Sequence, residues 1–463
     1  MVHRRKQLFC LGLALLVMSV LSVGLLADQL MSNEEILARV SEASIDWRQL
    51  EGTSIYVAFQ SESDTWKWEE YGLIGLFESL TGIHVDYTMF EEAQLREKTT
   101  IDVLTGTGIF DAYMYDPMYL RAYDRANGLQ DLNVFLTDCS LTDAQWMGWP
   151  GDFPTDFVAM GSLEDRVLGL PMHMSGQLLY YNKKLFAENG LDPEHAPATM
   201  EELREFAAAC HHPEDGVYGI ALRGLRGAGL NVFSWSSFFK AFGAEWFDEN
   251  WKPQLDSDEA IESVEFYASL IQDYGPPGAA NWEWSKILNA LQMGTIAITI
   301  DAPPLAATAE DPDKSETAGQ WGYAPNPAGP ADRVMTPYSW FLGINPDAEQ
   351  DKQQAAWLFL AFVTSQPVQA ALGPMETPSR KSVILDKSLN DIYPWMAEWQ
   401  AALVSNSDYA DPDARPRLPE WPEIGDTMGV ELESVIAGSK DASSACEAAN
   451  RQIERILKEA GYY

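Results

Sequence analysis

Hydrophobic positions in the first part of the chain alternate between short extended runs and segments with helical spacing. Residues 54–59, 83–87 and 110–115 are rich in β-branched and aromatic side chains, which predicts three strands. Residues 67–80 and 92–104 place apolar side chains three and four positions apart, which predicts two intervening helices. Strands that alternate with helices of this length are typical of βα units and indicate a largely parallel sheet.

A second series of elements begins with the apolar run LLYY at 178–181, which predicts a strand. The strand is followed by the turn signal Asn-Lys-Lys and by a short helical pattern that Gly190 closes. Thr199 is expected to cap the next helix, because Glu202 three residues later completes a capping box. Further strands are expected at 218–222, 295–300 and 321–327, an extended segment at 339–345, and helices around 237–242 and at 256–271, 352–364 and 445–460. Residues 408–422, rich in Pro and Asp, predict a surface loop.

The N-terminal segment has the pattern of an export signal. Arg4, Arg5 and Lys6 precede an uncharged, mostly apolar run at 8–27 that ends in small residues. We interpret 1–27 as a signal peptide cleaved after Gly24 or Ala27. Because the run is long for a signal peptide, an uncleaved membrane anchor is the alternative. Either reading predicts export, to the periplasm or outside the cell, with membrane anchoring if the segment is retained.

Length and charge restrict the classes of partner. A chain of 463 residues is too long for one compact core and suits two domains. Its net charge is −38, and loss of the three basic residues in 1–27 would take it to −41. Such a surface repels phosphate backbones and anionic lipid, so neither nucleic acid nor a membrane surface is expected as a partner. A strongly anionic ligand would need a local basic pocket.

Signatures of catalysis, metal binding or a cofactor are weak. Cys139, Cys210 and Cys446 follow the N-terminal segment without a CxxC pair. The sequence leaves open whether two of them form a disulfide and the third stays a free thiol. The sequence contains no GxSxG motif, and with 69 acidic residues any carboxylate spacing arises by chance. We therefore expect no metal, no cofactor and no enzymatic activity.

Two blocks of sequence resemble a known family. Residues 169–203, GLPMHMSGQLLYYNKKLFAENGLDPEHAPATMEEL, resemble the pattern GlP…YNK.LF…G…P.T..EL of the family 1 extracellular solute-binding proteins. These are the ligand-capturing subunits of ABC importers for sugars and polyols. Residues 274–301 resemble the family's GPPG…W.e….f..GkvAm.iD block. The resemblance covers roughly residues 51–460, and the block with Arg223-Gly224, Trp235 and GPPG looks most like the polyol and monosaccharide binders.

The resemblance implies an α/β, two-lobe fold of the periplasmic-binding-protein type II class, with mixed sheets, hinge crossings and a ligand cleft between the lobes. Residues 28–50 would be an N-terminal extension. Lobe 1 would comprise 51–172 and 340–385, and lobe 2 would comprise 173–339 and 386–463, with hinges near 171–176 and 337–340.

The resemblance also implies a function. A monomer would capture a sugar or sugar alcohol by closing its lobes and deliver it to the permease of an ABC importer. A secreted carbohydrate-active enzyme, a hydrolase or lyase, and a membrane-tethered carbohydrate sensor are the alternatives.

Sugar and polyol recognition requires aromatic faces for stacking and charged groups that hydrogen-bond hydroxyls. Trp284, Trp340 and Asp116 match cleft positions of the family, and Arg380 matches its P.R turn. The full set of candidates is Trp66, Asp116, Arg223, Trp235, Trp282, Trp284, Asp301, Trp340 and Arg380. Core packing is the alternative role for the tryptophans. An Asp-Pro turn is the alternative for Asp116, a structural salt bridge for Arg380, and His173 is expected to be a core histidine.

Overall fold

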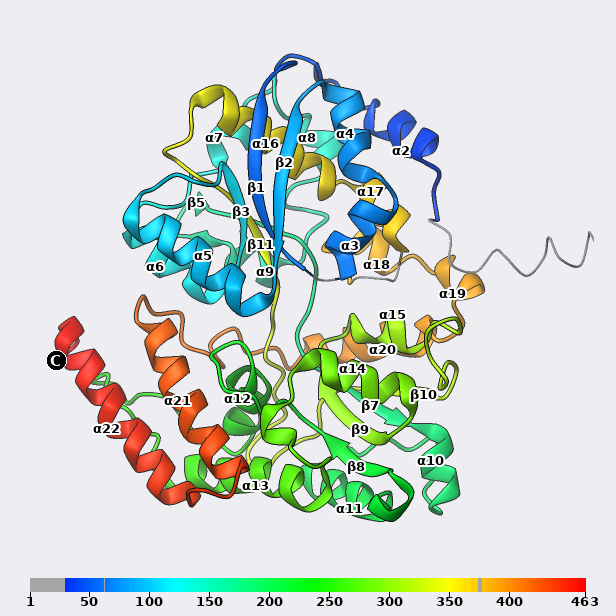
Figure 1. Ribbon diagram of the computed structural model, residues 1–463, viewed down its shortest axis with the longest axis vertical. Coiled ribbons are helices and arrows are strands. Elements are labelled where there is room, and N and C mark those ends of the chain that lie inside the picture. Colours follow the sequence, from blue (N-terminus) through cyan, green and yellow to red (C-terminus); the bar gives the residue numbers. More distant parts are fainter. Residues whose placement is uncertain (1–29, 62, 374–376) are drawn as a thin grey trace, which may run out of the picture.

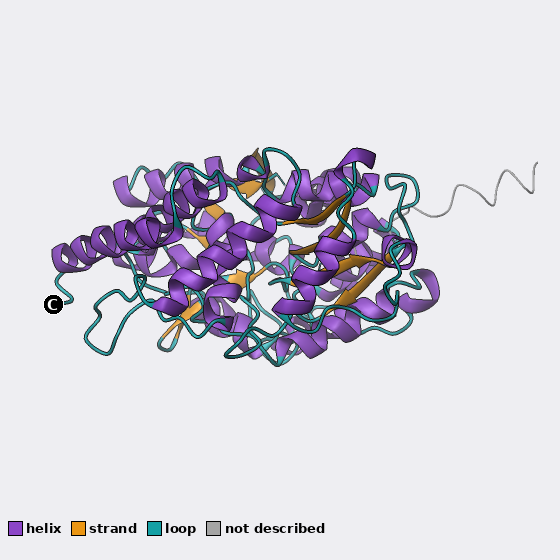
Figure 2. Ribbon diagram, turned by 90° about the horizontal axis from the view of Figure 1, so that it is seen from below, coloured by secondary structure: helices purple, strands orange, loops and turns teal. Residues whose placement is uncertain are grey.

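The protein consists of two halves, each built on one β-sheet with helices packed against it (Figure 1). Seen from below, helices surround the strands (Figure 2). The computed structural model describes residues 30–61, 63–373 and 377–463. The predicted signal peptide or anchor at 1–27 lies outside the described residues.

The sheet of the upper half in Figure 1 has five strands in the order β2-β1-β3-β11-β6. β1 pairs parallel with β2 and β3, whereas β11 runs antiparallel to β3 and β6, so the sheet is mixed. The strands of this half are β1 (Ser54–Gln60), β2 (His84–Phe90), β3 (Ala112–Tyr115), β6 (Leu170–Pro171) and β11 (Phe341–Ile344), with a separate ribbon of β4 (Ser162–Leu163) and β5 (Arg166–Val167). Every residue of β3 and β11 is buried, because helices cover both faces of the sheet.

The helices of this half differ from the sequence prediction in one place. The pattern at 67–80 predicted a single helix, but the structure has two, broken at Gly72, whose φ of 65° lies in the left-handed region. The helices are α2 (Asn33–Val40), α3 (Ser63–Glu70), α4 (Leu73–Thr81), α5 (Glu92–Thr105), η1 (Pro117–Tyr119), α6 (Leu120–Arg125), α7 (Asn133–Leu136), α8 (Ala144–Met147), α9 (Thr155–Met160), α16 (Gln350–Val363), α17 (Gln366–Leu372) and α18 (Lys381–Ile384).

The sheet of the lower half has four strands in the order β10-β7-β9-β8, and it is also mixed. Its strands are β7 (Leu178–Asn182), β8 (Tyr218–Ala221), β9 (Ile296–Asp301) and β10 (Trp321–Ala324). Its helices are α10 (Lys183–Glu188), α11 (Met200–Ala209), η2 (Pro213–Asp215), α12 (Asn231–Ala241), α13 (Asp258–Tyr274), η3 (Ala279–Asn281), α14 (Trp284–Met293), α15 (Leu305–Ala309), α20 (Met396–Ser407), α21 (Trp421–Ile436) and α22 (Ala442–Ala460), with α19 (Leu389–Ile392) on the connection to α20. Thr199 caps α11 as predicted, and its hydroxyl accepts from the Glu202 backbone N–H at 3.2 Å.

Two chain segments run side by side between the halves. The N–H of Met172 donates to the Trp340 carbonyl at 2.9 Å, and the N–H of Tyr338 donates to the Ser175 carbonyl at 3.1 Å. These bonds continue the pairing of β6 with β11 beyond the edge of the sheet. The crossings therefore form a short two-stranded ribbon that leads into β7.

The predicted loop at 408–422 is only partly a surface loop, because α21 begins at Trp421 and Arg415 is 1% exposed. The segment is bonded to neighbours on two sides. The N–H of Asp411 donates to the Met335 carbonyl at 2.9 Å, and the indole N–H of Trp246 donates to the Ala414 carbonyl at 2.8 Å. A loop anchored in this way holds its side chains in place.

Cysteine and hydropathy patterns add two observations. Cys139, Cys210 and Cys446 are all free thiols, so the disulfide left open from the sequence is not formed. Within the described parts of the chain no single helix is long and apolar enough to cross a membrane, although α16 and α17, bent by 49°, reach that length and hydropathy together.

Candidate functional site

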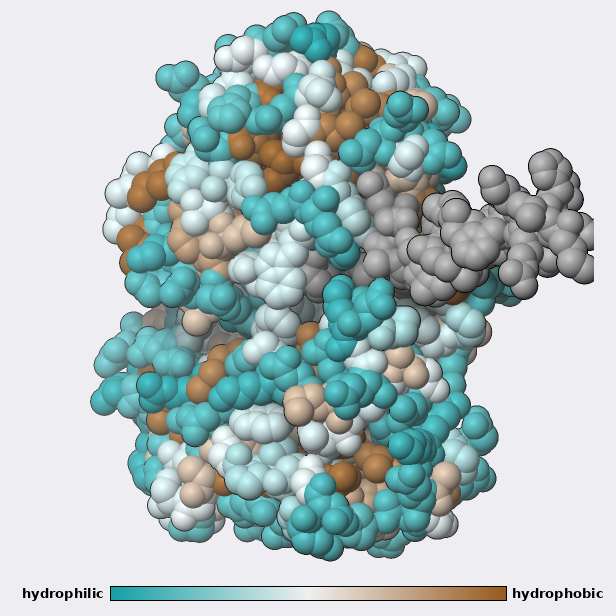
Figure 3. Space-filling model, turned by 45° about the vertical axis from the view of Figure 1, so that its right-hand side comes forward, coloured by the Kyte–Doolittle hydropathy of each residue, from teal (hydrophilic) through white to brown (hydrophobic). Residues whose placement is uncertain are grey.

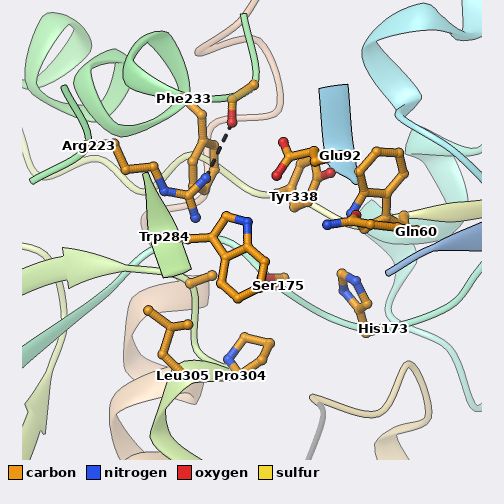
Figure 4. Close-up of a pocket in the computed structure, with 13 residues that line it drawn as sticks. Gln60, Glu92, His173, Ser175, Arg223, Phe233, Trp284, Pro304, Leu305 and Tyr338 are labelled. Carbon is orange, nitrogen blue, oxygen red and sulfur yellow. Dashed lines mark hydrogen bonds between the residues drawn. The ribbon is translucent and has the colours of Figure 1, made fainter. Parts of the chain in front are cut away.

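A cavity lies where the two halves meet, with about 570 Å³ of empty space that is partly open to solvent (Figure 4). Figure 3 shows the molecular surface hollowed along the boundary between the halves. Side chains from both halves and from the crossing ribbon line the cavity: Gln60, Glu92, His173, Ser175, Arg223, Gly229, Phe233, Trp284, Ala302, Pro304, Leu305, Tyr338 and Trp340. The lining thus combines aromatic rings with a few polar groups, which is typical of a small-molecule site.

The aromatic residues of the lining come from separate elements. Trp284 is the first residue of α14, whose N-terminus is capped by Glu283 through the Ser285 N–H at 3.0 Å. In Figure 4 its indole extends into the middle of the labelled side chains. Tyr338 and Trp340 lie on the returning crossing segment, with their rings 5.8 Å apart and nearly perpendicular. These faces are suited to stacking on the C–H surface of a sugar or polyol.

Arg223 and Asp301 form a buried ion pair at the edge of the lower sheet. β8 and β9 are parallel neighbours, so the residues that follow their carboxyl ends meet, as is usual for ligand sites of α/β sheets. The Arg223 Nε donates to Asp301 Oδ2 at 3.0 Å, and its Nη2 donates to Asp301 Oδ1 at 2.5 Å. Burial alone would lower the pKa of Arg223, but the Asp301 carboxylate raises it. Arg223 faces the cavity as a permanent cation that its partner orients.

Arg96 on α5 connects three groups of the upper half. Its guanidinium donates to Glu92 Oε1 at 2.6 Å and to Asp116 Oδ2 at 2.8 Å, and it lies 5.0 Å from the centre of the Trp340 ring. Asp116 also caps η1 by accepting from the Met118 N–H at 2.9 Å. Asp116 is therefore both a turn residue and an anchor for the arginine that packs on Trp340. It contributes no side-chain surface to the cavity lining.

The halves approach each other closely at Gly229. A Cβ atom at this position would collide with the Arg96 guanidinium of the opposite half. Farther out, Arg125 donates to Glu420 at 2.9 Å, which forms an ion pair across the boundary. The structure therefore describes a state in which the two halves touch both at the cavity lining and farther out along their boundary.

His173 lies on the crossing ribbon, where it is buried as expected for a core histidine, and it also lines the cavity. Only 3% of its surface is exposed. Burial lowers the pKa of its imidazole to about 4, so the ring is neutral at neutral pH. A neutral imidazole can both donate and accept a hydrogen bond.

Two of the predicted tryptophans lie outside this cavity. Trp66, on α3, is 48% exposed and its indole N–H donates to Ser61 Oγ at 2.9 Å. Trp235, on α12, is fully buried and donates to Ser263 Oγ at 3.2 Å. For Trp235 the structure favours the core-packing role that the sequence left open, because its helix turns the indole toward α13.

Trp282 and Arg380 also lie outside the lining. The backbone carbonyl of Trp282 accepts from the Gly224 N–H at 3.0 Å, so this residue supports the loop that follows β8. Arg380 is 1% exposed and donates to the Met147 carbonyl at 2.9 Å and to Asp152 at 3.2 Å. Its contacts match the structural salt bridge that was the alternative for this residue.

The sequence-based candidates thus divide into three groups, of which one, Trp66, Trp235, Trp282 and Arg380, lies outside the cavity lining. Arg223, Trp284 and Trp340 line the cavity, and Asp301 and Asp116 hold arginines beside it. Sequence reasoning missed most of the other lining residues: Gln60, Glu92, Ser175, Gly229, Phe233, Ala302, Pro304, Leu305 and Tyr338. Gln60 ends β1, and its position at a strand end was the one signal that would have indicated it.

The chain is similar to known proteins over most of its length. A sequence model of the bacterial extracellular solute-binding protein family matches residues 61–370. A mannitol-binding protein of Pseudomonas aeruginosa is 29% identical over 401 residues, which cover 83% of this chain and 89% of that protein. An erythritol/L-threitol-binding protein of Mycolicibacterium smegmatis is 25% identical and covers 79% of this chain and 78% of its own length.

Solved structures show a similar fold. The crystal structure of an ABC transporter solute-binding protein from Agrobacterium vitis, with bound D-mannitol, has a TM-score of 0.79 and 27% identity and covers 89% of this chain and 99% of its own. A protein of the same kind from Agrobacterium radiobacter, in complex with ribitol, has a TM-score of 0.79 at 24% identity, with 88% of this chain and 99% of that chain covered.

Proposed function

The chain belongs to the bacterial extracellular solute-binding protein family, and from this premise we propose that it captures a sugar alcohol or small sugar for an ABC importer. Its fold is the two-lobe α/β fold of the type II periplasmic binding proteins, as the sequence predicted. A protein of this family acts outside the cytoplasm, in agreement with the expected export.

The lining of the cavity is the observation that carries the proposal. Trp284 and Trp340 offer aromatic faces, while Arg223 offers an oriented charged donor. Aromatic faces suit the C–H surface of a carbohydrate, and charge-assisted donors suit its hydroxyl oxygens. The mannitol-binding and erythritol-binding relatives favour an acyclic polyol over an oligosaccharide.

Capture follows from the connection between the halves. In this proposal lobe 1 comprises 51–172 and 340–385, lobe 2 comprises 173–339 and 386–463, and the paired segments near 171–176 and 337–340 act as the hinge. The ligand contacts both lobes and shifts the population toward the closed state. The closed monomer then presents a composite surface to the permease.

A thermal-shift screen tests the proposal. D-mannitol, D-sorbitol, ribitol, erythritol, D-glucose and maltose would be added to the purified mature protein at increasing concentration. A ligand at 100 times its Kd stabilises the bound state by about 2.7 kcal/mol, so a true ligand raises the melting temperature in a dose-dependent way. If no member of the panel raises it, while an unrelated solute such as an amino acid does, the proposal is wrong.

The enzyme alternative has its own test. The relatives named above are binding proteins. We expect that incubation with maltose or longer oligosaccharides leaves them intact in chromatography. Release of a shorter sugar at a rate that scales with protein concentration would contradict this expectation.

A further inference from the structure

An arginine beside the cavity has no hydrogen-bond partner among the described residues. The guanidinium of Arg415 is buried, and its Nε, Nη1 and Nη2 atoms all lack an acceptor there. A guanidinium carries five N–H donors, and a buried charge without hydrogen bonds is costly. Such a group calls for an explanation, and a missing ligand is one.

The position of Arg415 links it to the cavity. Its Cζ atom lies 5.1 Å from the ring centre of Phe233 and 5.5 Å from that of Tyr338, and both rings line the cavity. The loop that carries it is fixed by the Trp246–Ala414 hydrogen bond on one side and by the Asp411–Met335 bond on the other. Arg415 is not itself in the cavity lining, but its anchored loop holds it against two rings that a ligand would touch.

The neighbouring charges define what kind of acceptor fits. Arg96 is bound by Glu92 and Asp116, and Arg223 is bound by Asp301. With Arg415, this network has three guanidiniums and three carboxylates, so its formal charges cancel although Arg415 lacks an acceptor. Glu283 also interacts with Arg223, which makes the surroundings more negative.

We propose that Arg415 binds the ligand, by donating two hydrogen bonds to adjacent hydroxyl oxygens of an uncharged polyol. This inference rests on the proposed function and specifies the ligand class of the same site. A carboxylate ligand would also satisfy Arg415, but it would add a negative charge to a balanced network beside Glu92, which lines the cavity. A vicinal diol supplies two acceptors in the spacing of the guanidinium fork without adding charge.

The first test compares variants by titration calorimetry with D-mannitol. Arg415→Met is expected to weaken binding by about 10- to 100-fold, because hydrogen bonds to a charged group are lost. Arg415→Lys keeps the charge but not the forked pair of donors. Its affinity for D-mannitol should lie between those of the wild type and Arg415→Met. The matched control is Arg417→Met in the same loop. The Arg417 side chain is 30% exposed and pairs with Asp413, so the Kd of this variant for D-mannitol should equal that of the wild type.

A second measurement separates binding from a merely structural role. The ligand-free melting temperature of Arg415→Met should be no lower than that of the wild type, because the variant removes an unpaired buried charge. Wild type and Arg415→Met would also be titrated with hexitols that lack one hydroxyl. If Arg415 contacts the missing hydroxyl, the binding free energy lost in Arg415→Met and the binding free energy lost with the hydroxyl should not add. For the other hydroxyls these two losses of binding free energy should add.

The outcomes distinguish the inference from the proposed function. Three results would overturn the inference alone. The losses of binding free energy are additive for every hydroxyl, or the Kd of Arg415→Met for D-mannitol stays within twofold of the wild type, or the wild type binds D-mannonate more tightly than D-mannitol. A wild-type protein that binds no sugar or polyol would overturn the proposed function, and the inference with it.

Discussion

Arg96 and Arg223 meet the cavity with their charges already paired, and this pairing determines what they can offer a ligand. Asp301 takes the Nε and Nη2 donors of Arg223, so the remaining Nη1 group is directed toward the Gly229 carbonyl at 3.4 Å and the cavity. Arg96 uses its donors on Glu92 and Asp116 and instead packs against Trp340. One arginine is therefore suited to contact ligand, and the other to position an indole.

His173 provides a prediction at the same scale. Its pKa is about 4 in the folded protein and 6.5 in an ordinary environment, because burial disfavours the charged ring. The unfolded chain therefore takes up the proton first as the pH falls. The contribution of His173 to stability is fully present above about pH 6.5 and is lost progressively toward pH 4, by about 3 kcal/mol.

Urea denaturation of wild type and His173→Gln between pH 7.5 and 4 measures this contribution. The difference in unfolding free energy should shift in favour of the variant by about 3 kcal/mol over that range. His84→Gln is the control, because Glu78 raises the pKa of that exposed histidine, and its effect should have the opposite sign. Parallel profiles for wild type and His173→Gln would contradict the prediction.

At the scale of elements, the start of α14 determines that Trp284 lines the cavity. Glu283 caps the helix, so Trp284 is held at its first position and extends into the cavity. Trp66 lies on α3, which Gly72 separates from α4, and it is solvent-exposed. Trp284 is the first residue of α14, whereas Trp66 is the fourth residue of α3, so the two indoles project from different places on their helices.

The pair Trp284 and Trp66 gives a matched test. Trp284→Ala should weaken binding of the ligand found in the screen by about tenfold or more, because a large aromatic contact is lost. Trp66→Ala should leave the Kd unchanged, since that indole contacts Ser61 instead of the cavity. Calorimetry on both variants measures this. Equal losses would mean that the lobes close differently when ligand is bound.

At the scale of the whole molecule, the two halves are connected by a paired ribbon and by the segment from α18 through α19 to α20, and they touch at further points. The Gly229–Arg96 approach and the Arg125–Glu420 ion pair lie on separate elements, and both would separate if the hinge opened. Small contacts of this kind allow a two-state equilibrium that a ligand can shift.

Small-angle scattering tests this equilibrium. We expect the radius of gyration of the wild type to fall when the screened ligand is added. Gly229→Ala should reduce that compaction and weaken binding, because its Cβ would meet the Arg96 guanidinium as the lobes close. Gly75→Ala is the control, since a Cβ at that position has no neighbour within 4 Å. Compaction of Gly229→Ala equal to the wild type would rule out this contact as a limit on closure.

The sequence alone determined the architecture, because it depends on local patterns. Runs of β-branched and aromatic residues, three-to-four spacing and the Thr199 cap predicted strands that alternate with helices. They also placed Arg223 and Asp301 at the ends of predicted strands. The resemblance of the 169–203 block to the family pattern implied the crossings and the two-lobe fold. These features need no knowledge of how distant elements pack. That the strands before Arg223 and Asp301 are parallel neighbours, which brings the two side chains together, came only from the structure.

Only the tertiary structure decided which side chains face the cavity. Trp235 and Trp284 both looked like cleft residues, and one packs into a core while the other lines the site, because their helices have different orientations. Arg415 lay in a segment that composition marked as a surface loop, yet packing against Phe233 and Tyr338 buries it. Orientation and burial arise from contacts between segments far apart in the chain, and no local pattern of residues encodes them.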